Sequence, residues 1–163
     1  MQRHALESIE NEPHPMGVNT VRKSLASAFS LDHFSSVYYE LDPDESFSGG
    51  LHTHHDQEEL FYVIEGTATF EIREDPDGGS TEMDVKAGEC IHFEPGDVFQ
   101  MGTNESEERV VALAIAGPGA GHEWDAIEAI VYCPDCGEET SQSVALAPDG
   151  LELTCNECGM VQG

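Results

Sequence analysis

The sequence has 163 residues, with 33 Asp and Glu against 6 Lys and Arg, and its formal net charge is −27. This length is enough for one full domain and a small additional unit. Nucleic-acid affinity comes largely from basic groups that displace counterions, so the charge excludes nucleic acid as an expected partner, and an anionic membrane surface for the same reason.

Two interpretations of the acidity remain open. One is a disordered or interaction-tail composition. The other is a halophilic cytoplasm, where molar salt reduces the Debye length to about 3 Å and screens self-repulsion. The acidic residues are spread among clear strand patterns, which favours the second interpretation. The start MQRHALESIENEP is unlike a secretory signal, and the run VVALAIAG is far shorter than the roughly 20 residues that span a bilayer, so we expect a cytoplasmic protein.

In chain order, residues 1–33 form an extension that we expect to pack on the following domain, with a short helix at 21–29. Residues 34–117 consist of short apolar or alternating stretches between turn signals such as EDPDGGS and EPGD. Strands are expected at residues 35–41, 47–54, 59–64, 67–73, 81–85, 90–93 and 109–116. This regular spacing, with no long helix, favours an all-β antiparallel sandwich or barrel.

Residues 118–129 break this pattern. Their Gly and Pro content indicates a linker, with a short helix at its end. Trp124 in this linker either docks the two flanking units together or has no such role. The remaining residues, 130–163, are expected to form a separate small unit.

Four of the five cysteines occur near the end in two Cys-x-x-Cys-Gly pairs. Two residues between thiolates let one tight turn present both sulfurs to one ion, so two such pairs match a four-cysteine zinc site. Redox-active dithiols are the alternative, but they require electropositive surroundings that this acidic tail lacks. The intervening segment SVALAPDGLELT fits two strands joined by a Pro-Asp-Gly turn. The expected zinc ligands are Cys133, Cys136, Cys155 and Cys158.

This C-terminal unit resembles the zinc-ribbon family over roughly residues 130–163. The resemblance implies a closed, structural Zn²⁺ site that does no catalysis, and an adaptor role toward a protein partner. Because so small a unit has little core, we expect its folding to depend on the metal, with an apparent binding free energy of about 10 kcal/mol or more.

The stretch HTHHDQEELFYVIEG places three histidines and several acids against an apolar run. His52 and His54 are two residues apart, so both side chains point to the same face of a strand. Glu59 lies five residues after His54, which would put it on the opposite face of a continuous strand. The polar segment 55–57 suits a bend, after which Glu59 can converge with the two imidazoles. This set can bind a divalent metal; the alternative is a pocket retained for packing or for binding without a metal.

The order of these residues resembles the first motif of the cupin superfamily, and a later stretch resembles its second motif. The matching residues are His52, His54, Glu59 and Gly66 in the first motif, and Gly88, Pro95, Gly96 and Asn104 in the second. The resemblance covers about residues 35–116. The chain is most similar to cupin 2-type barrels, and its acidity is similar to that of haloarchaeal proteins. The resemblance implies a cupin double-stranded β-helix (jelly-roll barrel), with the two histidines and the glutamate pointing inward onto a divalent metal. It also implies a homodimer.

One position departs from the cupin pattern. The second motif usually supplies another histidine four residues before the asparagine. Counting back from Asn104 gives Gln100, whereas counting forward from Gly96 gives Phe99. We prefer Gln100 as the fourth ligand, because its amide oxygen can bind a metal and a phenyl ring cannot. The resulting set suits Fe(II), Mn, Ni or Zn.

Other residues near these motifs are expected to lie outside the site. His55, Glu58 and His92 should face solvent, and Cys90 should be a small buried hydrophobe. The expected core includes Phe61, Phe70, Ile72 and Phe93. The sequence indicates no partners for the remaining histidines, which are His4, His14, His33 and His122.

Three functions remain open. The first is a binding or sensing module whose small organic ligand reaches the barrel metal. The second is a metalloenzyme, either a dioxygenase or similar to sugar-phosphate isomerases, whose metal acts as a Lewis acid or anchors oxygen. The types of the ligands also resemble those of cupin-type phosphomannose isomerases. The third is a structural or storage role. The fold does not decide between them, and no separate general acid or base can be named.

Overall fold

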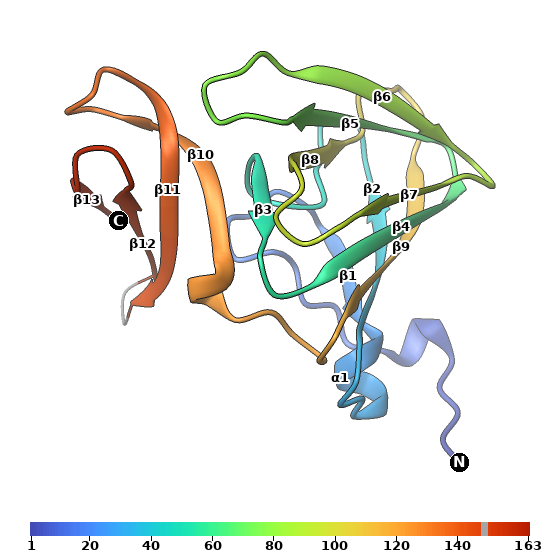
Figure 1. The fold of residues 1–163 in the computed structure, drawn as a ribbon. Helices are drawn as coiled ribbons and strands as arrows, with labels where there is room; N and C mark the ends of the chain where they lie inside the picture. Colours follow the sequence, from blue (N-terminus) through green and yellow to red (C-terminus); the bar gives the residue numbers. More distant parts are fainter. Residues whose placement is uncertain (148–149) are drawn as a thin grey trace.

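The computed structural model describes residues 1–147 and 150–163, in which the strands form two antiparallel sheets (Figure 1). The first has the order β1 (Val21–Ser24), β2 (Ser35–Leu41), β9 (Val110–Gly117), β4 (Glu58–Glu65) and β7 (Cys90–Phe93). The second has the order β13 (Val161–Gln162), β12 (Gly150–Cys155), β11 (Glu138–Ala147), β10 (Ile127–Cys133), β3 (His52–His54), β8 (Phe99–Thr103), β5 (Thr67–Arg73) and β6 (Thr81–Lys86). The all-β jelly-roll prediction is confirmed.

The helices of the described residues are short, and none is long and apolar enough to cross a membrane. They are η1 (Leu6–Ser8), α1 (Leu25–Phe29) and η2 (Trp124–Ala126). The segment 21–29, predicted as one helix, is half strand and half helix. Ser24 separates the two, because it ends β1 and its hydroxyl accepts a hydrogen bond from the backbone N of Ser27 as the N-cap of α1.

The hydrophobic core lies between the two sheets. It contains Leu41, Val63, Phe70 and Val110, which are fully buried. Burial of a side chain of this size stabilises a fold by about 1.5 to 3 kcal/mol. The predicted core residues Phe61, Phe70 and Phe93 are confirmed, and Ile72 packs against them while partly buried.

The predicted burial of Cys90 is wrong, because its side chain is exposed. Phe93 at the other end of β7 points into the core. Successive strand residues point to opposite faces, so an inward Phe93 turns Cys90 outward, three residues before it.

The strands β11 and β12 form the C-terminal hairpin, which continues the second sheet outward from the barrel beyond β10 (Figure 1). In the β10–β3 ladder, Ile127 is opposite His54 and Ala129 is opposite His52. β10 therefore runs across the predicted domain limit at residue 130, while the predicted division into 1–33, 34–117, 118–129 and 130–163 stays a prediction. In the first sheet, β1 from the N-terminal extension pairs with β2. The Pro148 and Asp149 of the predicted turn lie outside the described residues.

Candidate metal centres

The two histidines of β3 point toward one another, as their spacing predicts. His52 donates from Nδ1 to the carbonyl of Gly50 at 2.9 Å, which leaves its lone pair on Nε2. That atom lies 3.2 Å from His54 Nε2. Two nitrogens bound to one ion at about 2.1 Å each would be separated by about 3.0 to 3.4 Å. The two imidazoles are therefore spaced as neighbouring ligands of one metal.

Glu59 reaches the same point from the opposite sheet. The predicted bend at 55–57 is present: β3 ends before it, β4 begins after it, and the two strands belong to different sheets. Glu59 Oε2 lies 3.7 Å from His54 Nε2. One ligand atom from each of His52, His54 and Glu59 lies within 4.8 Å of the other two. The structure thus brings together the three residues predicted to bind the barrel metal.

Gln100 lies on β8, directly opposite His52 in the β3–β8 ladder. Its Nε2 donates to Glu59 Oε2 at 3.0 Å. Its predicted place beside the site is therefore observed, but in this orientation it contacts the carboxylate through its N–H. Its role as a fourth ligand through the amide oxygen stays a prediction.

The site is buried enough to remove charge from its residues. Burial raises the pKa of Glu59 to about 7, although the hydrogen bond from Gln100 opposes this shift. Burial, and secondarily His52, lowers the pKa of His54 to about 3, and burial also lowers the pKa of His52. His54 is therefore neutral, and its approach to Glu59 is not an ion pair. Neutral imidazoles beside a carboxyl that is costly to ionise form a place where a bound cation would stabilise the carboxylate.

A small cavity adjoins these side chains. Its volume is about 10 Å³, enough for roughly one water or ion. Its lining includes Thr53, His54, Gln57, Glu59, Phe93, Glu94, Val98 and Gln100. The space between the sheets at this point therefore matches an ion rather than an organic molecule, which would have to bind outside it.

His122, for which the sequence indicated no partner, also lies at the site. Its ring centroid is 5.0 Å from that of His54 and 4.9 Å from that of Trp124, to which its ring is nearly perpendicular. The bend before β4 positions it. Gln57 is buried and donates to the carbonyls of Pro118, Gly119 and Gly121 at 2.6, 3.2 and 3.0 Å. The polar bend therefore has a second role, which is to fix the segment that carries His122.

His55, Glu58 and His92 lie outside the site, facing solvent, as predicted. His55 and His92 are exposed, and each contacts a carboxylate of its own: Glu128 at 2.8 Å and Glu58 at 2.9 Å, respectively. Glu58 is also exposed. None of these four side chains belongs to the group formed by His52, His54 and Glu59.

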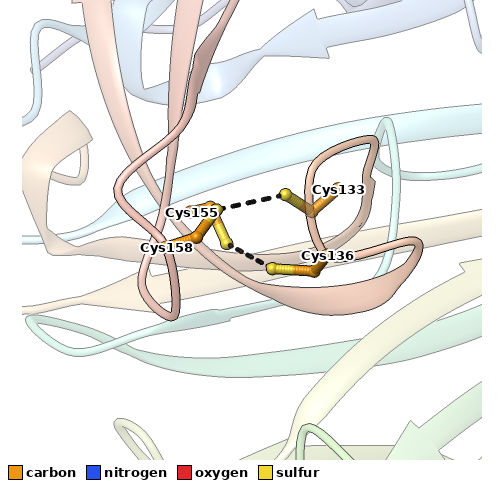
Figure 2. Close-up of side chains that lie close together, drawn as sticks. All are labelled: Cys133, Cys136, Cys155 and Cys158. Carbon is orange, nitrogen blue, oxygen red and sulfur yellow. Dashed lines mark hydrogen bonds between the residues drawn. The ribbon is translucent and has the colours of Figure 1, made fainter.

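The four C-terminal cysteines converge on one point (Figure 2). Cys133 Sγ lies 3.6 Å from Cys158 Sγ, and Cys136 Sγ lies 3.9 Å from Cys155 Sγ. A tetrahedral Zn²⁺ with bonds of about 2.3 Å would separate its sulfurs by about 3.8 Å. The hydrogen bond from Thr140, 3.2 Å away, lowers the pKa of Cys155 to about 6, whereas the hydrogen bond with Cys158 raises the pKa of Cys136. The thiolate that a metal requires is therefore favoured at Cys155.

Each pair of cysteines forms the tight turn that the sequence predicts. Gly137 N donates to the carbonyl of Cys133 at 2.8 Å, and Gly159 N donates to that of Cys155 at 2.9 Å. Both glycines have positive φ, of 78° and 76°, which other residues rarely adopt. The glycine after each pair is thus required for the backbone to curl around the sulfurs.

Comparison with known proteins agrees with this architecture. Residues 37–116 match the family model Cupin_2, described as Cupin domain. A sugar phosphate isomerase of Silicibacter pomeroyi, from a cupin superfamily, matches with 21% identity over 99% of this chain and 98% of its own, at a TM-score of 0.66. The polyketide cyclase RemF of Streptomyces resistomycificus matches with 20% identity over 83% of this chain and 89% of its own, at a TM-score of 0.63.

A third structure, the oxalate decarboxylase of Bacillus subtilis with Mn(II) centres, matches with 20% identity over 76% of this chain and 30% of its own, at a TM-score of 0.55. No curated protein sequence is detectably similar. At these identities the solved structures establish the fold and leave the activity open.

Proposed function

We propose that the barrel, whose residues 37–116 match the family model of the cupin domain, binds a divalent metal through His52, His54 and Glu59, with Gln100 as the fourth ligand. The convergence of three ligand atoms from two different sheets within 4.8 Å supports this proposal most directly. Two imidazoles and one carboxylate suit Fe(II), Mn, Ni or Zn and leave coordination positions for a small organic ligand. The protein would then act as a metal-dependent binding or sensing module.

The C-terminal cysteines would hold a structural Zn²⁺ as a zinc ribbon. The spacing of the sulfurs, the two glycine turns and the strands between them support this role. A site with four protein ligands has no open position, so this ion would stabilise the hairpin without taking part in chemistry.

Metal content tests both sites at once. Protein purified in high salt should contain one zinc and one further divalent ion per chain. His52→Ala should remove only the second ion, and Cys133→Ser should remove the zinc. His92→Ala is the matched control, because His92 is also a histidine on a strand but is exposed and paired with Glu58. If His52→Ala leaves metal content unchanged, the barrel site does not exist.

The second candidate function is a cupin metalloenzyme, either a sugar-phosphate isomerase or a dioxygenase. The Silicibacter isomerase favours the first of these, because its fold matches this chain over almost the full length of both, including the C-terminal hairpin. In an isomerase the ion would polarise a substrate carbonyl. Turnover of a panel of sugar phosphates by the metal-loaded protein supports an isomerase, and oxygen uptake by the Fe(II)-loaded protein supports a dioxygenase. Absence of both with metal bound supports the binding module.

Several broader predictions accompany this proposal. The net charge of −27 supports a haloarchaeal-like protein that works in a salty cytoplasm. A homodimer and a protein partner of the ribbon are also proposed. Light scattering of the purified protein tests the first of these, and cross-linking with and without the last 34 residues tests the second.

A further inference from the structure

A buried hydrogen-bonded chain of two side chains leads to one sulfur of the four-cysteine cluster. Thr140 Oγ1 lies 3.2 Å from Cys155 Sγ, and the two residues are only 3% and 2% exposed. Gln142, on the same strand as Thr140, is fully buried and donates from Nε2 to Thr140 Oγ1 at 2.7 Å. Among the described residues, no other sulfur of the cluster contacts a hydroxyl.

The strand pairing places these residues on one face of the second sheet. Thr140 and Gln142 are two residues apart on β11, so their side chains point to the same face. Gln142 is directly opposite Cys155 in the β11–β12 ladder, which puts this cysteine on that face as well. The same row continues through Ala129 of β10 to His52 of β3. The alternation of β11 therefore aims residues 140 and 142 at the cysteine, on the face that also carries the barrel histidines.

The amide of Gln142 determines where the hydroxyl of Thr140 points. A hydroxyl has one hydrogen to donate and lone pairs that accept. Because Gln142 Nε2 donates to Thr140 Oγ1, the hydroxyl accepts on that side, and its own hydrogen is left for Cys155 Sγ. The carbonyl of Val131, 3.5 Å from Gln142 Nε2, can only accept and so sets the orientation of the amide. Cys155 is thus supplied with a donor, which suits a metal-bound thiolate.

Gln142 also has an acceptor with no use. Its Oε1 is buried and has no hydrogen-bond partner among the described residues. A buried polar atom without a partner destabilises a fold, whereas a hydrophobic side chain of similar size would not. Packing alone therefore does not account for a glutamine at this position. The hydrogen bond that it donates to Thr140 is a role for which an amide is needed.

The four cysteines differ in their exposure. Cys133 and Cys155 are buried, Cys136 is partly exposed and Cys158 is exposed. A groove of about 570 Å³ adjoins the cluster and has Cys136 in its lining. Water or a competing ligand can therefore approach an ion in this site from the side of Cys136 and Cys158. Retention of the ion then depends on the buried pair, to which Cys155 belongs.

We propose that Thr140 and Gln142 are positioning residues for the ribbon metal: Gln142 orients the hydroxyl of Thr140, which donates to Cys155 and holds this sulfur in place for the ion. This inference rests on the proposed zinc site and adds two residues that bind no metal themselves. A sulfur that accepts a hydrogen bond is fixed in its orientation, and its lone pairs are lowered in energy. Partners of this kind behind a metal ligand change metal affinity by about ten- to a hundredfold.

Zinc retention and cobalt spectroscopy test this role. Thr140→Val keeps the shape of the side chain and removes the hydroxyl, so competition with a chelator should show a zinc affinity about ten- to a hundredfold lower. With Co²⁺ in place of zinc, the sulfur-to-cobalt charge-transfer band should move to longer wavelength, because the sulfur lone pairs rise in energy. This band requires sulfur ligands, so cobalt in the barrel does not contribute to it.

Three further variants sharpen the test. Thr140→Ser keeps a hydroxyl and should restore both the affinity and the band. Gln142→Leu leaves the hydroxyl but no longer orients it, so both properties should change in the same direction as in Thr140→Val, by a smaller amount. Thr154→Val is the matched control, because Thr154 precedes Cys155 on β12 and lies opposite Ser143, on the other face. It should change neither property.

The outcomes separate this inference from the proposed function. The positioning role is refuted, while the zinc site stands, if Thr140→Val behaves like Thr154→Val, or if it lowers the affinity and leaves the band in place. The latter result would assign the hydroxyl to packing alone. If Thr140→Val does not fold, Gln142→Leu decides: a shifted band supports the role, and an unshifted band refutes it. If the cysteines of the natural chain bind neither zinc nor cobalt, the proposed function itself fails.

Discussion

Ala129 of β10 lies directly opposite His52 of β3, and β10 ends four residues later at Cys133. One strand therefore covers the edge of the strand with both imidazoles and carries the first of the four thiolates. Further hydrogen bonds join the same segments: Ile130 N donates to Leu51 O at 2.9 Å. The two candidate metal centres are joined by one continuous sheet, so loss of the ion at one centre should weaken the other.

Removal of the ribbon metal should weaken the barrel site. Cys133→Ser is expected to abolish zinc binding and unfold the hairpin, because so small a unit depends on its ion. The exposed edge of β3 would then lose amide protection, and Mn²⁺ affinity of the barrel should fall. Hydrogen exchange and Mn²⁺ titration measure the two effects. Cys90→Ser, an exposed cysteine outside the cluster, should change neither; unchanged exchange in β3 after zinc loss would show that the sites are independent.

Metal binding to the barrel should release about one proton in mildly acidic solution. Burial raises the pKa of Glu59 to about 7, so below that pH the carboxyl must lose a proton to bind an ion. His54, with its pKa lowered to about 3, is already neutral. The logarithm of the Mn²⁺ association constant should therefore rise by about one per pH unit up to about 7 and then level off. Calorimetry in buffers of different ionisation enthalpy counts the protons, and release of three would contradict these shifts.

The pKa of Glu59 also predicts how the metal-free protein responds to pH. The folded state holds the Glu59 proton more tightly than the unfolded chain, whose carboxyl has an ordinary pKa near 4.5. This contribution to stability is complete below about pH 4.5 and is lost as the pH rises to about 7. Glu59→Gln removes the titrating group, so the unfolding free energy of the variant should fall less than that of the natural chain across this window. Equal slopes in urea titrations of the two proteins would show that Glu59 has an ordinary pKa.

Loss of Gln57 should release the segment that carries His122. Gln57→Ala removes a buried donor that contacts three backbone carbonyls, and we expect a loss of about 1 to 3 kcal/mol in the free energy of unfolding. Amides of residues 118–123 should exchange faster. Gln162→Ala removes a glutamine with a single carbonyl contact at the edge of the hairpin and is the control. Exchange that is unchanged at 118–123 would exclude this anchoring role.

Stability should depend on salt. At a net charge of −27, repulsion between surface carboxylates is screened only when the Debye length is short. The melting temperature should fall on transfer from molar KCl to dilute buffer. A melting temperature that stays constant or rises would refute the halophilic interpretation.

The strands with alternating residues and turn signals at both ends were predictable from sequence. The strands at 35–41, 67–73 and 90–93 have their predicted bounds, because alternation and turn residues mark both ends. The bend between His54 and Glu59 was predictable because they are five residues apart, an odd spacing that would put them on opposite faces of a continuous strand. The Cys-x-x-Cys-Gly spacing was equally informative, since the chemistry of a thiolate turn needs those residues in that order.

What sequence missed depends on contacts between distant segments. β8 was not predicted, because Gly102 breaks its pattern; in the structure a Cβ there would lie 2.6 Å from the rings of Phe47 and Phe70. His122 sits in a stretch that reads only as a linker, and the hydrogen bonds of Gln57 that position it span more than sixty residues of chain. No local pattern records such a contact.

Anomalous diffraction at the manganese edge, from crystals of the zinc-containing protein soaked in Mn²⁺, tests the central claim most directly. The expected result is one peak per chain between His52 Nε2, His54 Nε2 and the Glu59 carboxylate, absent in crystals of His52→Ala. Manganese found only at surface carboxylates, with these three side chains unchanged, would contradict the barrel site.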